Sequence, residues 1–479
     1  MKEQYYVALD VGSSSVKIVI GEKFHDGVNI IGTGQTFTDG VSKGMIRDFD
    51  LAKSGIIDTV KKAELIANID IDEVFLKVPI TNSDVIFTTE TLRFSGKDTE
   101  IDGELIEELL ENIRFKEIST DQEIVTVFPV SFVVDDLHEV EDPKGIIARE
   151  SLTVKAGIIA VDRTLFLNMG NCAAEAGLDI VDVTSDAYNY SHILTEAEIE
   201  LGAVVMDIGA DLTQYAYYKD GALKYAGVIP AGGNTITEVI AREFNTDFHY
   251  ANRAKEQYGH AFYERAPEGE RVVFPQNNGD KDVEVSAKDL SDVIEVTLED
   301  MFMEIFRELG EANIDDISGG FVITGGTANM RGIRDLLLDI VSEKVRVHIP
   351  TQMGARKPEF TSAIATVESG IRFDELLDYV TIDNHEEDYD RDDNEPIVEE
   401  EKQSIFPSLF RERKEKNQNV EVEEDVEYES DDDRYEEDEH DDYEREIVET
   451  SDVKNDPPKE KEKSDFGGFM KKVFKNLFE

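Results

Sequence analysis

Short apolar runs separated by glycine-bearing turns open the chain and predict β-structure. Residues 5–10, 16–21 and 28–33 are expected to form three strands. Residues 51–67 have the apolar spacing of an amphipathic helix, and residues 73–78 form another strand-like run. The opening block is therefore expected to fold in the order strand, strand, strand, helix, strand.

The same order returns about 200 residues later. Residues 203–207, 212–219 and 222–228 are predicted strands, and residues 235–244 a predicted helix. Another strand at 320–323 leads to a helix at 332–338. The pattern predicts an α/β protein with two duplicated βββαβα halves.

Two smaller segments interrupt these halves. The first combines strand-like runs at 85–94, 124–134 and 152–161 with an amphipathic helix at 105–113, which predicts an α+β subdomain. The second, from residue 241 to about 289, is polar and rich in turns and precedes a long helix at 294–309. We expect both to be inserted subdomains.

After about residue 378 the chain becomes strongly acidic. Between residues 381 and 465 acidic side chains outnumber basic ones about three to one, so this tract has too little apolar surface to fold and is expected to be disordered. An apolar island at 405–410 is followed by Arg411 and Arg413. It is either incidental or a docking motif.

The last residues have the pattern of an amphipathic helix that lies on a membrane. Gly467 and Gly468 provide a hinge. The helix has a bulky apolar face and an opposite face of lysines, formed by Phe466, Phe469, Met470, Val473, Phe474, Leu477 and Phe478 and by Lys471, Lys472 and Lys475 respectively. The alternative is a helix packed on its own core. One such helix binds weakly, so self-association would be needed for firm attachment.

Composition narrows the classes of function. The 479-residue chain has a formal net charge of -57, which excludes a nucleic-acid binder because phosphates would be repelled. Its single cysteine, Cys172, excludes an intramolecular disulfide and indicates a packed thiol in a reducing, cytoplasmic setting. The sequence shows no signal peptide and no membrane-spanning run, so we expect neither secretion nor a transmembrane segment.

The two halves carry matching hairpin tips built on Asp-x-Gly, at residues 10–12 and 207–209. A glycine lets the backbone approach a ligand, and successive N–H groups with the hydroxyls of Ser13, Ser14 and Ser15 can bind phosphate oxygens. Either tip alone is better explained as a plain turn. Their recurrence in a repeated block predicts that both grip one polyphosphate. Asp10 and Asp207 would then lie near a hydrated Mg²⁺, with Lys17 adding a positive charge.

Two further glycine clusters precede predicted helices, at 232–235 and 325–328. A strand followed by a glycine turn and a helix is a common setting for phosphate and adenosine. We therefore expect four glycine-bearing turns to converge on one cleft between the two halves.

These motifs together resemble the phosphate and adenosine motifs of the actin, Hsp70 and sugar-kinase superfamily. Within it, residues 1–380 and the terminal helix are similar to the FtsA family of bacterial cell-division proteins. The position of the first insert after residue 78, and the segment 195–202, favour this branch. The resemblance implies an actin-like ATPase fold around a nucleotide cleft, with ATP and Mg²⁺ as ligands.

The resemblance also implies site residues and domain bounds. The expected nucleotide contacts are Asp10, Gly12, Ser13, Ser14, Ser15, Lys17, Asp207, Gly209, Ala210, Asp211, Thr213, Gly232, Gly233, Asn234, Arg253, Lys255, Glu256, Gly325, Gly326, Thr327, Ala328 and Met330. The expected domains are 1–81 with 159–199 and part of 363–380, the insert 82–158, 200–240 with 303–362, the insert 241–302, the linker 381–465 and the helix 466–479.

Two departures from the family pattern suggest slow chemistry. Ala210 and Asp211 stand where glycines are common, and residues 184–187 read Thr-Ser-Asp-Ala where Glu-Pro is frequent. A carboxylate near the γ-phosphate would weaken ATP binding or slow hydrolysis, and Gln214 is the candidate to orient a water molecule. We expect an ATPase that is slow at most.

The resemblance implies a protein that self-associates on the cytoplasmic face of the membrane at the division septum. Its partners would be the tubulin-like protein FtsZ, whose tail binds the second insert, anionic lipids and later division proteins. Two alternatives remain from the sequence. One is a kinase or ATPase of the same fold, and the other is an actin-like adaptor of the pilus-assembly type.

Overall fold

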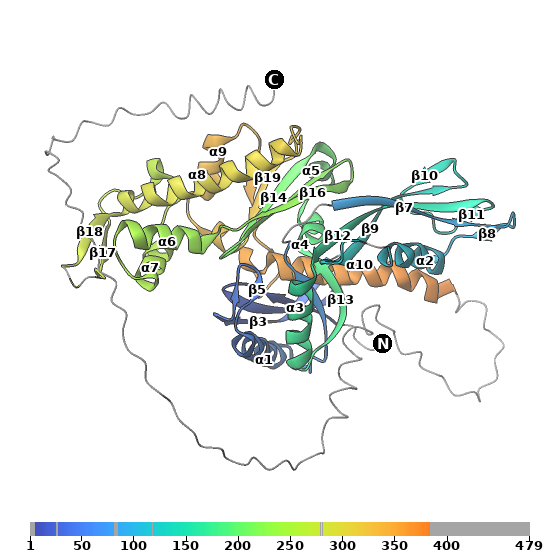
Figure 1. Cartoon of the computed structure of the whole chain (residues 1–479), viewed down its shortest axis with the longest axis horizontal. Helices are drawn as coiled ribbons and strands as arrows, with labels where there is room; N and C mark the ends of the chain where they lie inside the picture. The colour runs from blue at the N-terminus through green and yellow to red at the C-terminus, as the bar shows by residue number, and fades with distance from the viewer. Residues whose placement is uncertain are drawn as a thin grey trace, which may run out of the picture. The chain divides into compact units, whose positions relative to one another are not determined.

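A computed structural model describes residues 5–24, 27–80, 85–116, 118–277, 279 and 281–383. Most of the predicted acidic linker and the whole predicted terminal helix lie outside these residues. Their predicted roles therefore depend on the sequence alone. Within the described chain, the strands and helices expected in both halves are present, with bounds that differ from expectation by a few residues (Figure 1).

The first half is built on a mixed five-stranded sheet in the order β13-β6-β1-β2-β3. Its strands are β1 (Tyr5–Val11), β2 (Ser15–Phe24), β3 (Gly27–Phe37), β6 (Glu73–Val78) and β13 (Asp179–Ser185). Strand β1 pairs antiparallel with β2 and parallel with β6. A two-residue hairpin, β4 (Val41–Ser42) and β5 (Met45–Ile46), follows β3.

The second half repeats this sheet strand for strand, in the order β16-β15-β14-β19-β20. Its strands are β14 (Ala203–Ile208), β15 (Thr213–Lys219), β16 (Ala222–Ile229), β19 (Gly320–Thr324) and β20 (Val345–Val347). The central strand β14 again pairs antiparallel with the next strand and parallel with a later one. The predicted duplication is therefore present in the topology.

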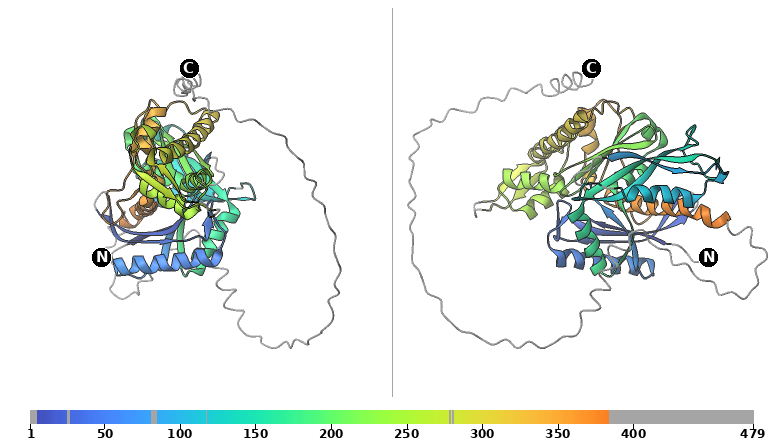
Figure 2. Two further views of the ribbon diagram at one scale, coloured as in Figure 1. Left: turned by 90° about the vertical axis from the view of Figure 1, so that its left-hand side faces the viewer. Right: turned by 45° about the vertical axis from the view of Figure 1, so that its right-hand side comes forward.

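Helices cover the sheet of the first half on both faces (Figures 1 and 2). Helix α1 (Phe49–Ala67) packs on β2 and β3, and α3 (Arg163–Glu175) packs beside it. Asp48 caps the first turn of α1 by accepting from the amide of Leu51. Helix α10 (Thr361–Asp383) covers the other face through β1 and β2. The main core, with buried Leu9, Ile18 and Leu76, fills the side of the sheet that faces α1 and α3, and a separate cluster with Tyr6 and Ile364 fills the side that faces α10.

The segment between β6 and α3 forms a four-stranded sheet in the order β10-β9-β12-β7. Its strands are β7 (Val85–Arg93), β9 (Gln122–Val134), β10 (His138–Val140) and β12 (Ser151–Asp162), and α2 (Gly103–Arg114) packs on it. The sequence predicted the long elements but missed β10 and the short pair β8 (Thr99–Glu100) and β11 (Ile147–Ala148). Strands of two or three residues are too short to show an alternating pattern.

The polar region after α6 (Gly233–Glu243) has more regular structure than the sequence suggested. It contains α7 (Phe248–Tyr258), the hairpin of β17 (Arg271–Phe274) and β18 (Val283–Ser286), and the start of α8 (Ala287–Glu311). Helix α7 buries only Ala251 and Ala254, so it lacks the apolar stripe that would reveal it. Helix α8 begins earlier than expected because Ser286 and Asp289 form a capping box.

The remaining elements are short helices. They are α4 (Asp186–Asn189), η1 (Tyr190–Ile193), α5 (Glu196–Leu201), η2 (Tyr263–Arg265), η3 (Gly326–Asn329), α9 (Ile333–Ile340) and η4 (Pro358–Phe360). Among the described residues, none of the helices combines the length and apolar character that spanning a bilayer requires.

Candidate functional site

The two hairpin tips have the same backbone turn. The amide of Gly12 donates to the carbonyl of Ser15 at 3.1 Å, and the amide of Gly209 donates to the carbonyl of Leu212 at 2.9 Å. Asp10 lies opposite Lys17 in its hairpin, and Asp207 lies opposite Gln214 in the other. The duplicated strands therefore place the two aspartates in equivalent positions.

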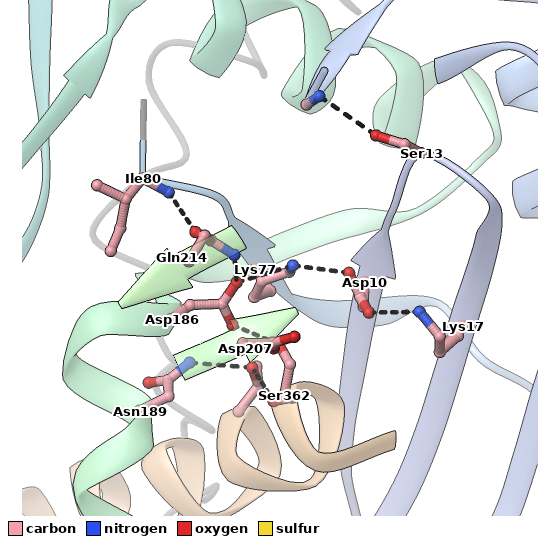
Figure 3. Close-up of polar contacts among 12 residues, drawn as sticks. Asp10, Ser13, Lys17, Lys77, Ile80, Asp186, Asn189, Asp207, Gln214 and Ser362 are labelled. Carbon is pink, nitrogen blue, oxygen red and sulfur yellow. Dashed lines mark hydrogen bonds and ion pairs between the residues drawn. The ribbon is translucent and has the colours of Figure 1, made fainter. Parts of the chain in front are cut away.

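Asp10 is buried between two lysines (Figure 3). Lys17 lies 3.0 Å from one carboxylate oxygen, and Lys77, on the neighbouring strand β6, lies 2.8 Å from the other. Burial alone would raise the pKa of Asp10, but the two lysines hold it far below its usual range. Asp10 is therefore a permanently charged, neutralised carboxylate.

Asp207 has a different environment. The hydroxyl of Tyr190 donates to its Oδ2 at 2.7 Å. Burial first, and then the charge of Asp186, raise the pKa of Asp207 to about 6, although Tyr190 and Lys77 offset part of this effect. Its partner on the parallel strand is the neutral Thr324, where Asp10 has Lys77. Asp207 consequently lacks the close cations that neutralise Asp10.

Asp186, at the start of α4, joins the two halves (Figure 3). Its Oδ2 accepts from Lys77 at 2.9 Å and from Gln214 at 2.7 Å, and its Oδ1 accepts from Ser362 of α10. Asp186 is fully buried, so these three donors satisfy a charge that would otherwise be costly. A continuous polar network thus runs from Asp10 to the neighbourhood of Asp207.

Gln214, the residue expected to orient a water molecule, is part of this network. Its amide nitrogen donates to Asp186, and its amide oxygen accepts from the backbone N–H of Ile80 at 2.6 Å. Both ends of the side chain therefore have protein partners in this arrangement. That Gln214 orients a water molecule stays a prediction.

Three of the predicted glycine turns are brought together. The carbonyl of Gly209 accepts from the amide of Gly233 at 2.9 Å and from the hydroxyl of Thr327 at 3.1 Å. Gly325 has a φ of 88°, and a Cβ there would collide with Oδ1 of Asp207. Only glycine permits this approach of the third turn to the carboxylate.

Lys255 lies at the same place. Its ammonium donates to the carbonyl of Gly233 at 2.6 Å and to the hydroxyl of Thr237 at 2.7 Å. Burial lowers the pKa of Lys255 to about 8. A buried cation held by neutral oxygens would be stabilised by an anionic ligand beside it.

The β4–β5 tip links the two loops. The amide of Lys43 donates to Oδ2 of Asp211 at 2.8 Å, and the amide of Gly44 donates to the hydroxyl of Ser13 at 3.4 Å. Asn234 also donates to Asp211, at 2.7 Å. Asp211, which departs from the family pattern, therefore holds both the β4–β5 hairpin of the first half and the turn at residues 232–235.

The other expected contacts are distributed around this centre. Ser14 is exposed, whereas Ser15 is buried and accepts from Gln35 at 3.2 Å. Thr213 is buried and donates to the carbonyl of Ala231 at 2.8 Å. Ala210 and Gly232 lie where the second tip meets the turn at 232–235, because the carbonyl of Ala210 accepts from the amide of Asn234 at 2.7 Å and a Cβ at Gly232 would collide with it. The other expected positions are Gly326, Ala328 and Met330 in the third turn, and Arg253 and Glu256 on α7.

Sequence reasoning missed four members of the network, namely Lys77, Asp186, Tyr190 and Ser362. One signal was available, because Lys77 is a charged residue within the apolar run of a buried strand. The others come from segments distant in sequence, which no local pattern connects.

The site residues are better suited to a divalent cation that keeps most of its water ligands than to one coordinated mainly by protein side chains. No group of three or more His, Cys, Asp or Glu side chains poised to hold a metal ion is found in the part of the chain that the structure describes. Asp207 is a buried carboxylate whose negative charge is only partly balanced by nearby positive charge. Mg²⁺ commonly takes one or two protein carboxylates and keeps several waters.

Two duplicated sheets, whose matching glycine tips meet over one polar network, define the class of actin-like proteins. A solved structure of a PilM–PilN type IV pilus biogenesis complex has this fold. Its TM-score is 0.53 at 17% identity, over 76% of this chain and 98% of that one. The predicted fold class is therefore confirmed.

Sequence comparison defines the family within this class. The model for the cell division protein FtsA matches residues 204–365, and the model for the SHS2 domain inserted in FtsA matches residues 83–160. FtsA of Staphylococcus epidermidis is 49% identical over 88% of this chain and 91% of its own length. FtsA of Bacillus subtilis is 30% identical over 77% of this chain and 84% of its own length. The chain belongs to the FtsA family of cell-division proteins, which confirms the resemblance.

Proposed function

We propose that this protein binds ATP with Mg²⁺ between its two halves, self-associates, and tethers FtsZ to the cytoplasmic face of the membrane at the division septum. The observation that carries the nucleotide part is that two glycine tips with the same turn hydrogen bond both lie next to the network of Asp10, Lys77, Asp186 and Asp207. Backbone amides at such tips suit phosphate oxygens on both sides of one ligand.

The tips have different tasks in this proposal. The amides and hydroxyls around Ser13 and Ser14 bind phosphate from the first half, and the amides around Gly209 bind it from the second. Lys255 and the turn at Gly325 to Thr327 border the adenosine. Asp207 is the main carboxylate for Mg²⁺ and Asp10, already paired with two lysines, is the second, both through water. When bound, the ion would neutralise the phosphate charge next to Asp207.

We also propose that hydrolysis is slow at most. A water molecule needs a base or an amide to orient it, and both Asp186 and Gln214 are held by protein partners. ATP then acts mainly as a structural ligand that stabilises the closed pair of halves. This agrees with a tethering protein that need not release a chemical product.

Membrane attachment is assigned to the terminal helix at residues 466–479, which lies outside the described part of the chain. Its aromatic face and three lysines suit an anionic lipid surface, but one copy binds only weakly. Self-association would supply the avidity that firm attachment needs. The FtsZ tail is assigned to the second insert, residues 241–302, and the first insert to filament contacts and later division proteins.

The direct test is sedimentation with anionic liposomes, ATP and FtsZ. The full chain should pellet with the liposomes and carry FtsZ, and a chain ending at Asp465 should leave both in the supernatant. Phe469→Ser with Phe474→Ser should act like the truncation, whereas Glu479→Ser, which lies among the lysines on the polar face, should not. Unchanged pelleting of the truncated chain would overturn the anchor.

Nucleotide binding needs its own readout. Gly326→Trp should weaken a fluorescent ATP analogue at least roughly tenfold, about 1.4 kcal/mol, by filling the adenosine side. A side chain at Gly326 is compatible with the fold, because its Cβ would meet only Glu359, at 4.0 Å. Normal analogue affinity in the Trp variant would count against the assigned position of the base.

A further inference from the structure

The loop between β4 and β5 contacts both glycine tips. It consists of two residues, Lys43 and Gly44. The amide of Lys43 donates to Oδ2 of Asp211 in the second tip, and the amide of Gly44 donates to the hydroxyl of Ser13 in the first tip (Figure 3). A Cβ at Gly44 would come within 3.0 Å of Leu212, which also belongs to the second tip. The loop therefore lies against both tips that are proposed to bind the phosphates.

The base of this hairpin is fixed in the first half. Val41 is buried in the main core, and Met45 and Ile46 pack against the same core. The amide of Arg47 donates to the carbonyl of Gly40 at 2.8 Å, which closes the hairpin at its base. The two-residue loop is thus held in place by the first half while it contacts the second.

The backbone of the loop is unusual for the residues that it carries. Lys43 has a φ of 50° and Gly44 a φ of 72°, so both lie in the left-handed region. Two-residue hairpin loops of this conformation favour Asn or Asp followed by Gly, because most other side chains are strained there. Lysine thus stands where asparagine would fit with less strain. Residues held in a strained conformation cluster at binding sites, which points to a ligand for Lys43.

Lys43 also provides a positive charge that the other lysines of the site do not. Lys17 and Lys77 are ion-paired with the buried Asp10. Lys255 donates to two neutral oxygens of the second half. Lys43 is exposed, and its ammonium has no carboxylate partner among the residues that the structure describes. Of these four lysines, it is the one whose charge is available to a ligand at the tips.

We propose that Lys43 binds the terminal phosphate of ATP, an inference that rests on the nucleotide site proposed above. The bond from its amide to Asp211 holds the residue beside the second tip, and its flexible four-carbon stem lets the ammonium reach a phosphate between the tips. The amides of the tips serve the inner phosphates. The terminal phosphate carries the most negative charge and meets the carboxylate of Asp211, so it gains most from a cation.

The same arrangement couples the terminal phosphate to the contact between the halves. Lys43 belongs to the first half and Asp211 to the second, so the ammonium is placed at the tips only while the two halves are in contact. A phosphate bound by Lys43 stabilises that contact. ATP should therefore hold the β4–β5 loop against the second tip, whereas ADP, which lacks the terminal phosphate, should not.

Lys43→Asn separates ligand binding from folding. Asparagine removes the ammonium and is favoured in this turn, so the melting temperature without nucleotide should stay the same or rise. Affinity for the β,γ-imido analogue of ATP, measured with Mg²⁺ by isothermal titration calorimetry, should fall about tenfold, and affinity for ADP should change less than about twofold. Lys43→Arg keeps the charge and should retain most of the affinity for the ATP analogue.

Hydrogen exchange gives a second readout of the same contact. In the parent, the ATP analogue should slow exchange of the amides at residues 41–46 more than ADP does, and Lys43→Asn should lose this difference. Lys61→Gln is the control, because it removes the same charge at an exposed position of α1. It should leave the affinity for both nucleotides unchanged.

The results distinguish the role of Lys43 from the nucleotide site itself. Unchanged affinity of Lys43→Asn for the ATP analogue would overturn the role of Lys43 and leave the site in place. Equal losses for the analogue and for ADP would also overturn it, because Lys43 would then not act on the terminal phosphate. A parent protein that binds neither nucleotide would overturn the proposed site and this inference together.

Discussion

Asp10 and Asp207 occupy the same place in the two halves of the molecule, each two residues before the glycine of a tip with the same turn. Around Asp10, the neighbouring strands supply Lys17 and Lys77. Around Asp207, the equivalent positions hold Gln214 and Thr324, and the nearest added charge is the carboxylate of Asp186. The pKa is lowered at Asp10 and raised to about 6 at Asp207.

The difference shows what a duplicated scaffold fixes and what it leaves open. Strand order and turn geometry set where each carboxylate lies, whereas the side chains on the two adjoining strands set its charge state. One half carries an aspartate that is already neutralised and serves as an anchor. The other half carries an aspartate whose missing positive charge a ligand can provide.

The largest expected effect is at the anchor. Asp10→Asn should lower the free energy of unfolding by about 3–5 kcal/mol, because Lys17 would be left as a buried charge without its partner. Denaturant unfolding measures this. Asp98→Asn, which breaks an exposed pair with Arg149, is the control and should cost no more than about 1 kcal/mol. Similar losses in both variants would remove the distinction between anchor and surface charge.

Gln214→Ala removes the neutral residue that stands where the first half has Lys17. It should lower the free energy of unfolding by about 1–3 kcal/mol, since the amide of Ile80 loses its acceptor and Asp186 loses a donor. Gln35→Ala, which removes a part-buried bond to Ser15, provides a comparison. If stability is unchanged while ATP turnover falls, Gln214 orients water and is not a structural link.

Asp207→Asn tests the ligand side of the comparison. Affinity for ATP in the presence of Mg²⁺ should fall roughly tenfold, about 1.4 kcal/mol, because the ion loses its main carboxylate. With EDTA in place of Mg²⁺, the variant should bind ATP at least as well as the parent, because it lacks a carboxylate beside the phosphates. Equal losses with and without Mg²⁺ would mean that Asp207 acts on the nucleotide and not on the ion.

The smallest effect is expected at Asp211, the carboxylate beside the second tip. Asp211→Asn keeps an acceptor for the amide of Lys43 but removes a negative charge near the proposed phosphates. ATP affinity should rise about threefold to fivefold, up to about 1 kcal/mol. Isothermal titration calorimetry measures this change in ATP affinity, and Asp39→Asn, at an exposed site, is the control variant. Weaker binding would show that the link to the β4–β5 tip matters more than the charge.

The sequence predicted four of the five strands in each half because these strands and the amphipathic helices carry clear local periodicity, but it did not predict β13 or β20. It also predicted the tips, since Asp-x-Gly recurs in equivalent contexts. It did not predict that Asp186 and Ser362 meet, because they come from segments 176 residues apart. The sequence did not predict helix α7, because only two residues of the helix, both alanines, are buried. The difference in pKa between Asp10 and Asp207 depends on their neighbours on the adjacent strands. These neighbours are known only when the pairing register of the strands is known.

The central claim is tested most directly by the stability of the nucleotide-free protein in EDTA as a function of pH. The pKa of Asp207 in the folded protein, about 6, lies above the ordinary value of 3.8 for an exposed aspartate, so its ionisation costs stability as the pH rises through this interval and the full cost is present above about pH 7. Asp207→Asn should therefore be more stable than the parent at pH 7.5, by up to about 3 kcal/mol because each pKa unit is worth about 1.4 kcal/mol, and close to it near pH 4. Asp10→Asn should be less stable than the parent at pH 7.5. Destabilisation of similar size by both substitutions at pH 7.5 would contradict the account.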